Sequence, residues 1–273
     1  MKNKQFLAVL LAFLVCVSLS TKAFASSVVT IDAVGLSKYG LCSYGDRAGG
    51  QYVDKLIGGI GENYSYIRNK VYTTGSTFSN KVYKSDVLSA NRNPSTLFVY
   101  AGHGVILSSS TNAFHINDNT NNANHSTFSG GEKSSSSPVN VKTTELANTN
   151  HQYMIAYTCN FLANGGSTEK QKNIYRIGAR VLCGFASTMY LDSREGLYCG
   201  QLMGSQSVRS AFINAARKYQ PYIGEGSSVI ARAVGLSSAN VERINSGNSL
   251  APKYDNSPSS YTTLQDATIV GKG

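Results

Sequence analysis

Short apolar runs and amphipathic segments alternate along most of the chain. The length and composition of the apolar runs predict buried strands at residues 27–36, 96–101, 153–158 and 179–185. Apolar residues at three-and-four spacing predict helices at residues 51–60, 81–90, 167–177, 207–219 and 227–236. Short buried strands that alternate with helices predict an α/β fold, namely a three-layer α/β/α sandwich with a mainly parallel sheet.

One polar segment interrupts this alternation. Residues 108–140 are rich in Ser, Asn and Gly, and they contain few aliphatic residues outside 114–116. A polar loop of this length inside a compact domain is usually functional or disordered, so we expect a long loop at about 108–140. The polar tail beyond residue 247 has room for a late pair of strands.

The first 25 residues have the pattern of a signal peptide. Lys2 and Lys4 precede an apolar run at residues 6–17, and Ala23 and Ala25 provide the small residues that a signal peptidase needs. The run is shorter than the roughly 20 residues that span a bilayer. We therefore expect bacterial export, a secreted or cell-surface location, and no membrane span once residues 1–25 are removed.

The length and net charge of the mature chain limit its number of domains and its binding partners. Removing 25 residues from 273 leaves 248, which suits a single domain over residues 26–273. The net charge of +10 falls to +7 without Lys2, Lys4 and Lys22. A basic chain favours anionic partners, but no stripe of Lys and Arg with interleaved aromatics is present. We therefore expect that the protein does not bind nucleic acid. Two interpretations of the positive charge stay open: binding of an anionic polymer at the cell surface, and a basic surface that is simply solvated.

Two of the predicted strands end in reactive side chains. The strand at 96–101 leads to His103, and the strand at 153–158 leads to Cys159. If these strands are parallel neighbours, the imidazole and the thiol share the sheet edge where α/β folds place their chemistry. An imidazole raises the thiolate fraction and can protonate a leaving group. The N–H groups of Gly104 and Cys159 are candidates for an oxyanion hole.

Plainer interpretations of the same residues stay open. A histidine between two glycines is often an ordinary loop residue whose ring nitrogens are hydrogen-bonded. Cys159 alone could be a buried thiol or half of a disulfide. The other histidines, His115, His125 and His151, are in polar segments, where we expect them to be solvated. A serine hydrolase would need a GxSxG nucleophile elbow between a strand and a helix, and none is present.

The pattern "GHG" followed by "CN", each at the end of an apolar strand, resembles the caspase, gingipain and legumain group of cysteine peptidases. The resemblance is closest to its secreted bacterial members. It implies an α/β/α sandwich, a catalytic dyad of His103 and Cys159, a protein or peptide substrate, and no cofactor. Unlike caspase-type enzymes, this chain has Thr158 before Cys159 and Asn160 after it, with the first glycine at Gly165. A catalytically degenerate binding or adhesion module at the cell surface is therefore the alternative.

Substrate specificity is much less readable. Asp46 and Arg47 lie in a stretch that faintly resembles the caspase segment in which an arginine grips an acidic substrate side chain. Asp192 and Arg194, which follow the predicted strand at 179–185, are rival candidates for substrate binding. Asp46 and Arg47 could also simply be ordinary charges of a surface loop.

Four cysteines remain after residue 25, namely Cys42, Cys159, Cys183 and Cys199. An exported chain usually oxidises such cysteines in pairs. If Cys159 is reserved for chemistry, the shortest closure joins Cys183 to Cys199, although an apolar setting around Cys183 also suits free thiols. No CxxC motif or His/Cys cluster with zinc spacing is present, so we expect no metal site.

Overall fold

The structure, a computed structural model, describes residues 28–36, 48–73, 84–117, 139–220, 228–246 and 261–271. The expected signal peptide lies outside these residues. So do Cys42, Asp46, Arg47 and His125, and most of the polar segment between residues 117 and 139.

A seven-stranded sheet forms the centre of the molecule, in the order β10-β9-β8-β7-β3-β1-β2. The five strands from β8 to β2 run parallel, whereas β9 pairs antiparallel with β8 on one side and with β10 on the other. The strands are β1 (Val29–Gly35), β2 (Tyr66–Thr73), β3 (Ser95–Ala101), β7 (His151–Tyr157), β8 (Val181–Phe185), β9 (Ser228–Leu236) and β10 (Tyr261–Val270). The prediction of a mainly parallel sheet is confirmed.

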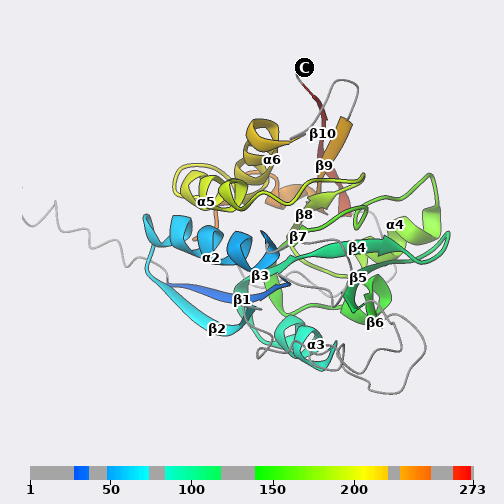
Figure 1. Ribbon diagram of the computed structural model, residues 1–273, viewed down its shortest axis with the longest axis horizontal. Coiled ribbons are helices and arrows are strands. Elements are labelled where there is room, and N and C mark those ends of the chain that lie inside the picture. The colour runs from blue at the N-terminus through cyan, green and yellow to red at the C-terminus, as the bar shows by residue number, and fades with distance from the viewer. Residues whose placement is uncertain are drawn as a thin grey trace, which may run out of the picture.

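Helices cover both faces of this sheet (Figure 1). One face carries α2 (Ala48–Gly61), α5 (Ser193–Leu202) and α6 (Val208–Tyr219). The other carries α3 (Lys84–Arg92), α4 (Thr168–Tyr175) and a small antiparallel sheet made of β4 (His103–Ile106), β5 (Asn112–Asn117) and β6 (Val139–Lys142). Single 3₁₀ turns follow at Thr143–Leu146 and Ser237–Ala239. The three-layer α/β/α sandwich predicted from the sequence is therefore confirmed.

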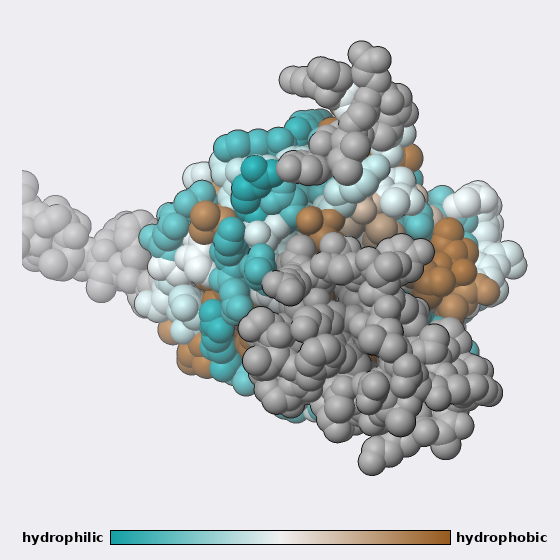
Figure 2. Space-filling view, in the orientation of Figure 1, coloured by the Kyte–Doolittle hydropathy of each residue, from teal (hydrophilic) through white to brown (hydrophobic). Residues whose placement is uncertain are grey.

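The core lies between the layers, where β3 and β7 are almost completely buried. Strands covered on both faces need apolar side chains at successive positions, which is why they appear in the sequence as continuous apolar runs. An apolar area lies where the β4–β5 hairpin turns, visible at the right of Figure 2. Ile106 and Leu107 at this turn are 48% and 38% exposed.

The helix predicted at residues 227–236 is wrong, because the segment forms strand β9. Val229, Ala231 and Ala233 are buried, while Ile230 and Arg232 between them are only partly covered. This period of two is the strand signal, and the apolar residues at helical spacing masked it. Of the late strand pair that the tail could hold, β10 is described, and it pairs with β9.

The polar segment after residue 108 is not a continuous loop, because residues 112–117 form strand β5 and β6 begins at residue 139. His151 is not a solvated loop residue either. It is fully buried in β7, stacks on Phe98 and shares a hydrogen bond of 2.6 Å with Ser95 through Nδ1. In the part of the chain that the structure describes, no helix is long and apolar enough to cross a membrane.

Candidate functional site

The strands that lead to His103 and Cys159 are parallel neighbours in the sheet. Ala101, the last residue of β3, is in register with Tyr157, the last residue of β7. His103 and Cys159 each follow two residues later, and the Gly102 N–H donates to the Tyr157 carbonyl at 3.1 Å. The structure therefore brings the two residues together at the carboxyl edge of the sheet, as the strand order required.

Gly104 lies directly against the main chain of Cys159. A Cβ atom added to Gly104 would lie 2.2 Å from the Cys159 carbonyl oxygen and 2.5 Å from Thr158 Oγ1. Real Cβ atoms do not approach other heavy atoms this closely, so only glycine fits here without movement of the backbone. The contact fixes the start of β4 against the residue that carries the thiol.

The Cys159 thiol is half buried and contacts the chain that follows β8. Its Sγ accepts a hydrogen bond from the Met189 N–H at 3.3 Å and donates to the Met189 carbonyl at 3.5 Å. Both distances are within the usual limit for sulfur hydrogen bonds. The position of the sulfur atom thus depends on the backbone around Met189.

The turn after Cys159 contains a residue in the left-handed conformation. Asn160 has a φ of 58°, a region that favours glycine and in which asparagine is the most tolerated alternative. Its N–H donates to the Ser187 carbonyl at 2.9 Å. Asparagine therefore takes the left-handed conformation directly after Cys159, where glycine is the usual alternative.

Asn112 of β5 holds the same turn, and sequence reasoning did not single it out. Its Nδ2 atom donates to the carbonyls of Phe161 and Ala163 at 2.9 and 2.7 Å. The Phe161 ring stacks on Phe114, which in turn stacks on Tyr100. This aromatic stack joins β3, β5 and the turn, so the β4–β5 hairpin and Cys159 keep a fixed relation. The apolar residues around 114–116 were the available signal.

His103 begins strand β4 and faces His115 across the β4–β5 ladder. His115 is half buried, and its Nδ1 shares a hydrogen bond of 2.9 Å with Asn140 Oδ1. The expectation that His115 is a solvated loop residue is wrong. The Tyr100 hydroxyl lies 2.8 Å from the His115 carbonyl and 3.3 Å from that of His103, so β3 supports both strands from below.

Behind Cys159 is a buried polar cluster that the sequence did not reveal. Glu195 of α5 is completely buried, and its Oε2 accepts hydrogen bonds from the Tyr157 hydroxyl at 2.9 Å and from Gln220 Nε2 at 2.8 Å. Burial raises the pKa of Glu195 to about 8. Burial also raises the pKa of Tyr157 well above its usual range, so the phenol keeps its proton. Tyr52 of α2 stacks on Tyr157 with ring centroids 3.6 Å apart.

Asp192 and Arg194, the rival candidates for substrate binding, contact each other. Asp192 caps α5 by accepting the Arg194 N–H at 2.8 Å, and Arg194 Nη2 forms an ion pair with it at 2.6 Å. Burial acts to raise the pKa of Asp192, but the hydrogen bonds from Arg194 outweigh it, so the pKa is below its ordinary value. The pair has an evident structural role in starting α5.

The Cys183–Cys199 disulfide is not formed, since the structure has Cys159, Cys183 and Cys199 as separate thiols. Cys183 lies inside β8 and Cys199 inside α5, both fully buried in the core. Burial raises the pKa of both thiols above their ordinary value. Both cysteines therefore pack in the core as small apolar side chains, without a crosslink.

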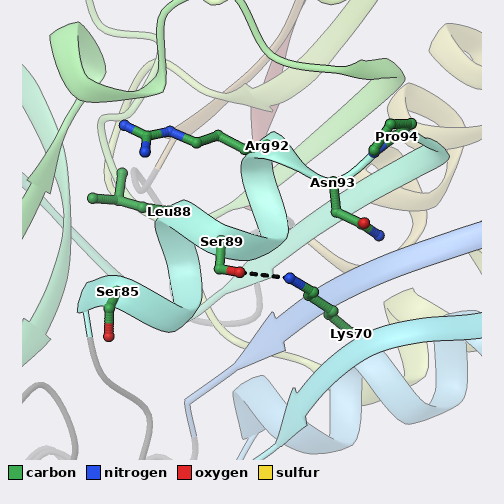
Figure 3. Close-up of a pocket in the computed structure, with 7 residues that line it drawn as sticks. All are labelled: Lys70, Ser85, Leu88, Ser89, Arg92, Asn93 and Pro94. Atoms are coloured by element: carbon green, nitrogen blue, oxygen red, sulfur yellow. Dashed lines mark hydrogen bonds between the residues drawn. The ribbon is translucent and has the colours of Figure 1, made fainter.

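Within the described residues, no group of three or more His, Cys, Asp or Glu side chains could hold a metal ion. One pocket of about 440 Å³ lies on the α3 face, away from Cys159 (Figure 3). Lys70 of β2 and Arg92 of α3 line it, and Lys70 Nζ donates to Ser89 Oγ at 2.6 Å. Its other lining residues are Ser85, Leu88, Asn93 and Pro94, so no carboxylate is among those that line it.

The chain matches a known family over a region that includes the ends of β3 and β7. A family described as a domain of unknown function (DUF6345) matches residues 31–265, which include His103, Cys159 and Glu195. The chain belongs to this family. No curated protein matches it.

Among solved structures, this DUF6345 chain is similar to the Arg-specific cysteine proteinase gingipain R. The two share 10% sequence identity with a TM-score of 0.44, and the match covers 72% of this chain. It covers 44% of the gingipain chain, so the DUF6345 protein corresponds to less than half of that protein.

Proposed function

We propose that the protein is a cysteine-type peptidase related to the caspase, gingipain and legumain group, with Cys159 as nucleophile and His103 as general base and acid. The observation that carries this proposal is the register of β3 and β7. It pairs Ala101 with Tyr157 and so starts the His103 and Cys159 segments side by side. The contact of Gly104 with the Cys159 carbonyl supports the same arrangement.

The chemistry requires only groups at this edge. His103 takes the proton of the Cys159 thiol, and the thiolate attacks the carbonyl carbon of a peptide bond. The N–H groups of Gly104 and Cys159 would donate to the oxyanion that forms. The C–N bond then breaks as His103 gives its proton to the leaving amine. Water, deprotonated by His103, hydrolyses the thioester and releases the second product.

The pattern of residues 1–25 supports a proposal for where this activity takes place. We propose that the chain is exported by residues 1–25 and acts outside the cell on a protein or peptide substrate. Asp46 and Arg47 remain candidates for the substrate pocket. Asp192 and Arg194 are weaker ones, because binding a charged substrate side chain would have to break their mutual ion pair.

Labelling by a thiol-directed peptide probe tests the assignment. The wild-type protein should react at Cys159 and cleave members of a peptide library under mild reductant. Cys159→Ala and His103→Gln should each lower cleavage by orders of magnitude, because the members of such a pair act as a unit. His115→Gln, on the facing strand, is the matched control and should retain labelling. Undiminished cleavage by Cys159→Ala would rule out the proposal.

The α3 pocket favours a second function, that of a binding module for an anionic polymer at the cell surface. Both cationic side chains line the pocket, and in the described part of the chain neither Lys70 nor Arg92 forms an ion pair, which favours an anionic ligand. A soluble polyphosphate should bind with a salt-dependent affinity, which Lys70→Gln combined with Arg92→Gln should weaken. Lys172→Gln, on α4, is the control. Equal binding by all three proteins would exclude the pocket.

A further inference from the structure

The backbone that holds the Cys159 thiol is itself held by a buried cluster. We call residues 189–192 the Met189 segment. Its first residue contacts the Cys159 sulfur. Its second residue, Tyr190, is bound at both backbone groups by Gln220, since Tyr190 N–H donates to Oε1 at 3.0 Å and Nε2 donates to the Tyr190 carbonyl. The Met189 segment therefore connects the thiol to the interior of the molecule.

The Tyr157 hydroxyl also contacts this segment, and it has more acceptors than protons. The acceptors within hydrogen-bond distance are Glu195 Oε2 at 2.9 Å, the Tyr190 carbonyl at 3.2 Å and the Asp192 carbonyl at 3.3 Å. The phenol oxygen itself accepts from the Asp192 N–H at 3.0 Å and from Gln220 Nε2 at 3.3 Å. A phenol has one proton and can satisfy only one of them well at a time. The choice depends on whether Glu195 carries a proton.

The two protonation states of Glu195 lead to different contacts. When Glu195 is protonated on Oε2, it donates to the Tyr157 oxygen, and the phenol proton is left to bind the carbonyl of Tyr190 or that of Asp192. When Glu195 is ionised it can only accept. Because a hydrogen bond to a charged acceptor is stronger, the phenol proton turns to the carboxylate and the segment carbonyls lose this bond. The bond from the Asp192 N–H to the phenol oxygen does not need that proton and remains.

We propose that Glu195 is a positioning residue whose proton controls how firmly the Met189 segment holds the Cys159 thiol. The inference deepens the proposed function, on which it rests for the role of the thiol, and it adds regulation by pH to the same site. Glu195 does not touch the thiol and acts only through Tyr157 and the Met189 segment. It is thus distinct from the His103–Cys159 pair.

The groups around Glu195 decide the pH at which the change occurs. Tyr157 of β7 and Gln220 after α6 donate to it, and the charge of Asp192 at the α5 cap opposes its ionisation. Tyr52 of α2 and Cys199 of α5 face the cluster as neutral groups, because burial raises the pKa of each. With a pKa of about 8 against an ordinary 4.5, Glu195 is protonated at neutral pH and ionises just above it.

Hydrogen exchange of the Met189 segment tests this without reference to peptidase activity. In the wild-type protein, protection of residues 189–192, corrected for the intrinsic rate of exchange, should fall several-fold between pH 7 and pH 9. Glu195→Gln stays neutral and can donate to Tyr157, so its protection should be high and independent of pH. Tyr157→Phe removes the shared proton and also the oxygen that accepts the Asp192 N–H, so its protection should be low throughout the range and should not change with pH.

Matched controls separate the proposal from a general loss of stability. Glu169→Gln changes an exposed carboxylate of α4 and should keep the wild-type fall in protection. Constant protection in the wild-type protein, or an unchanged fall in Glu195→Gln, would overturn the proposal. If Glu195→Gln does not fold, Tyr157→Phe decides, because a wild-type fall in that variant would overturn it as well. Failure of the peptidase assignment would appear in Cys159→Ala and leave this exchange result intact.

Discussion

Gly104 and Cys159 are in contact through their main chains, with 2.2 Å between the Cys159 carbonyl oxygen and the place a Cβ atom would take at Gly104. No rotamer change can relieve such a clash, because one of the atoms is backbone. The start of β4 and the Cys159 turn must therefore separate if any side chain is added. The relationship makes Gly104 a sensitive point for both stability and thiol chemistry.

Gly104→Ala should destabilise the fold by about 1–3 kcal/mol, the usual cost of overpacking. It should also lower the rate of Cys159 labelling, because the turn is displaced. Gly58→Ala is the control: Gly58 lies in α2, and a Cβ atom there meets nothing within 4 Å. That change should stabilise by about 0.5–1 kcal/mol through helix propensity. Thermal unfolding of both variants measures the effect, and a stable, fully reactive Gly104→Ala protein would contradict the contact.

The left-handed conformation of Asn160 gives a second prediction. Asn160→Ala should cost about 1–2 kcal/mol, because alanine is strained at a φ of 58°, whereas Asn160→Gly should be nearly neutral. Asn148 has a φ of 56°, precedes β7 at the end of the strand opposite to Cys159, and provides the comparison. Asn148→Ala should cost similar stability but leave Cys159 labelling unchanged. Equal labelling in both alanine variants would show that the turn at Asn160 does not position the thiol.

These sites show how far the sequence alone determines the fold. The strands before His103 and Cys159 were predictable, because strands buried on both faces are continuous apolar runs, and parallel neighbours must end at the same edge. Strand β9 was not predicted, because its alternation of covered and half-covered residues is imposed by antiparallel neighbours that the sequence does not name. Which strands pair is decided by contacts between residues far apart in the sequence, and the local spacing of apolar residues does not reveal these contacts.

The supporting residues were missed for the same reason. Asn112 reaches the turn after Cys159 across 49 positions, and Gln220 reaches Glu195 across 25. In the sequence both are single polar residues in unremarkable surroundings. At an exposed helix position Glu195 would be an ordinary surface charge. Its carboxyl group is buried only because of the tertiary packing around it.

The three described thiols should differ sharply in reactivity. In a protein carrying Cys16→Ser and Cys42→Ser, a neutral alkylating reagent should modify Cys159 under native conditions and leave Cys183 and Cys199 intact. The last two are fully buried, and burial raises the pKa of each thiol, so little thiolate is present. All three should react after unfolding in denaturant. Mass mapping that found Cys183 joined to Cys199 in the native protein would contradict the free thiols of the core.

His151 should make the fold sensitive to acid. Burial lowers the pKa of His151 from 6.5 to about 3, so the folded protein keeps a neutral imidazole where the unfolded chain binds a proton. The unfolded state binds more protons between these two values, so this contribution to the free energy of unfolding is complete above pH 6.5 and is lost as the pH falls towards 3. The slope for one proton is at most about 1.4 kcal/mol per pH unit.

His151→Asn, which cannot titrate and keeps an acceptor or donor towards Ser95, should be less stable at pH 7 because the stacking on Phe98 is lost. Its stability should nevertheless fall less steeply than that of the wild type between pH 6.5 and pH 4, as measured by denaturant unfolding at each pH. Parallel pH profiles for the two proteins would mean that the imidazole is charged in the folded state, or that acid opens the β3–β7 region before the protein unfolds.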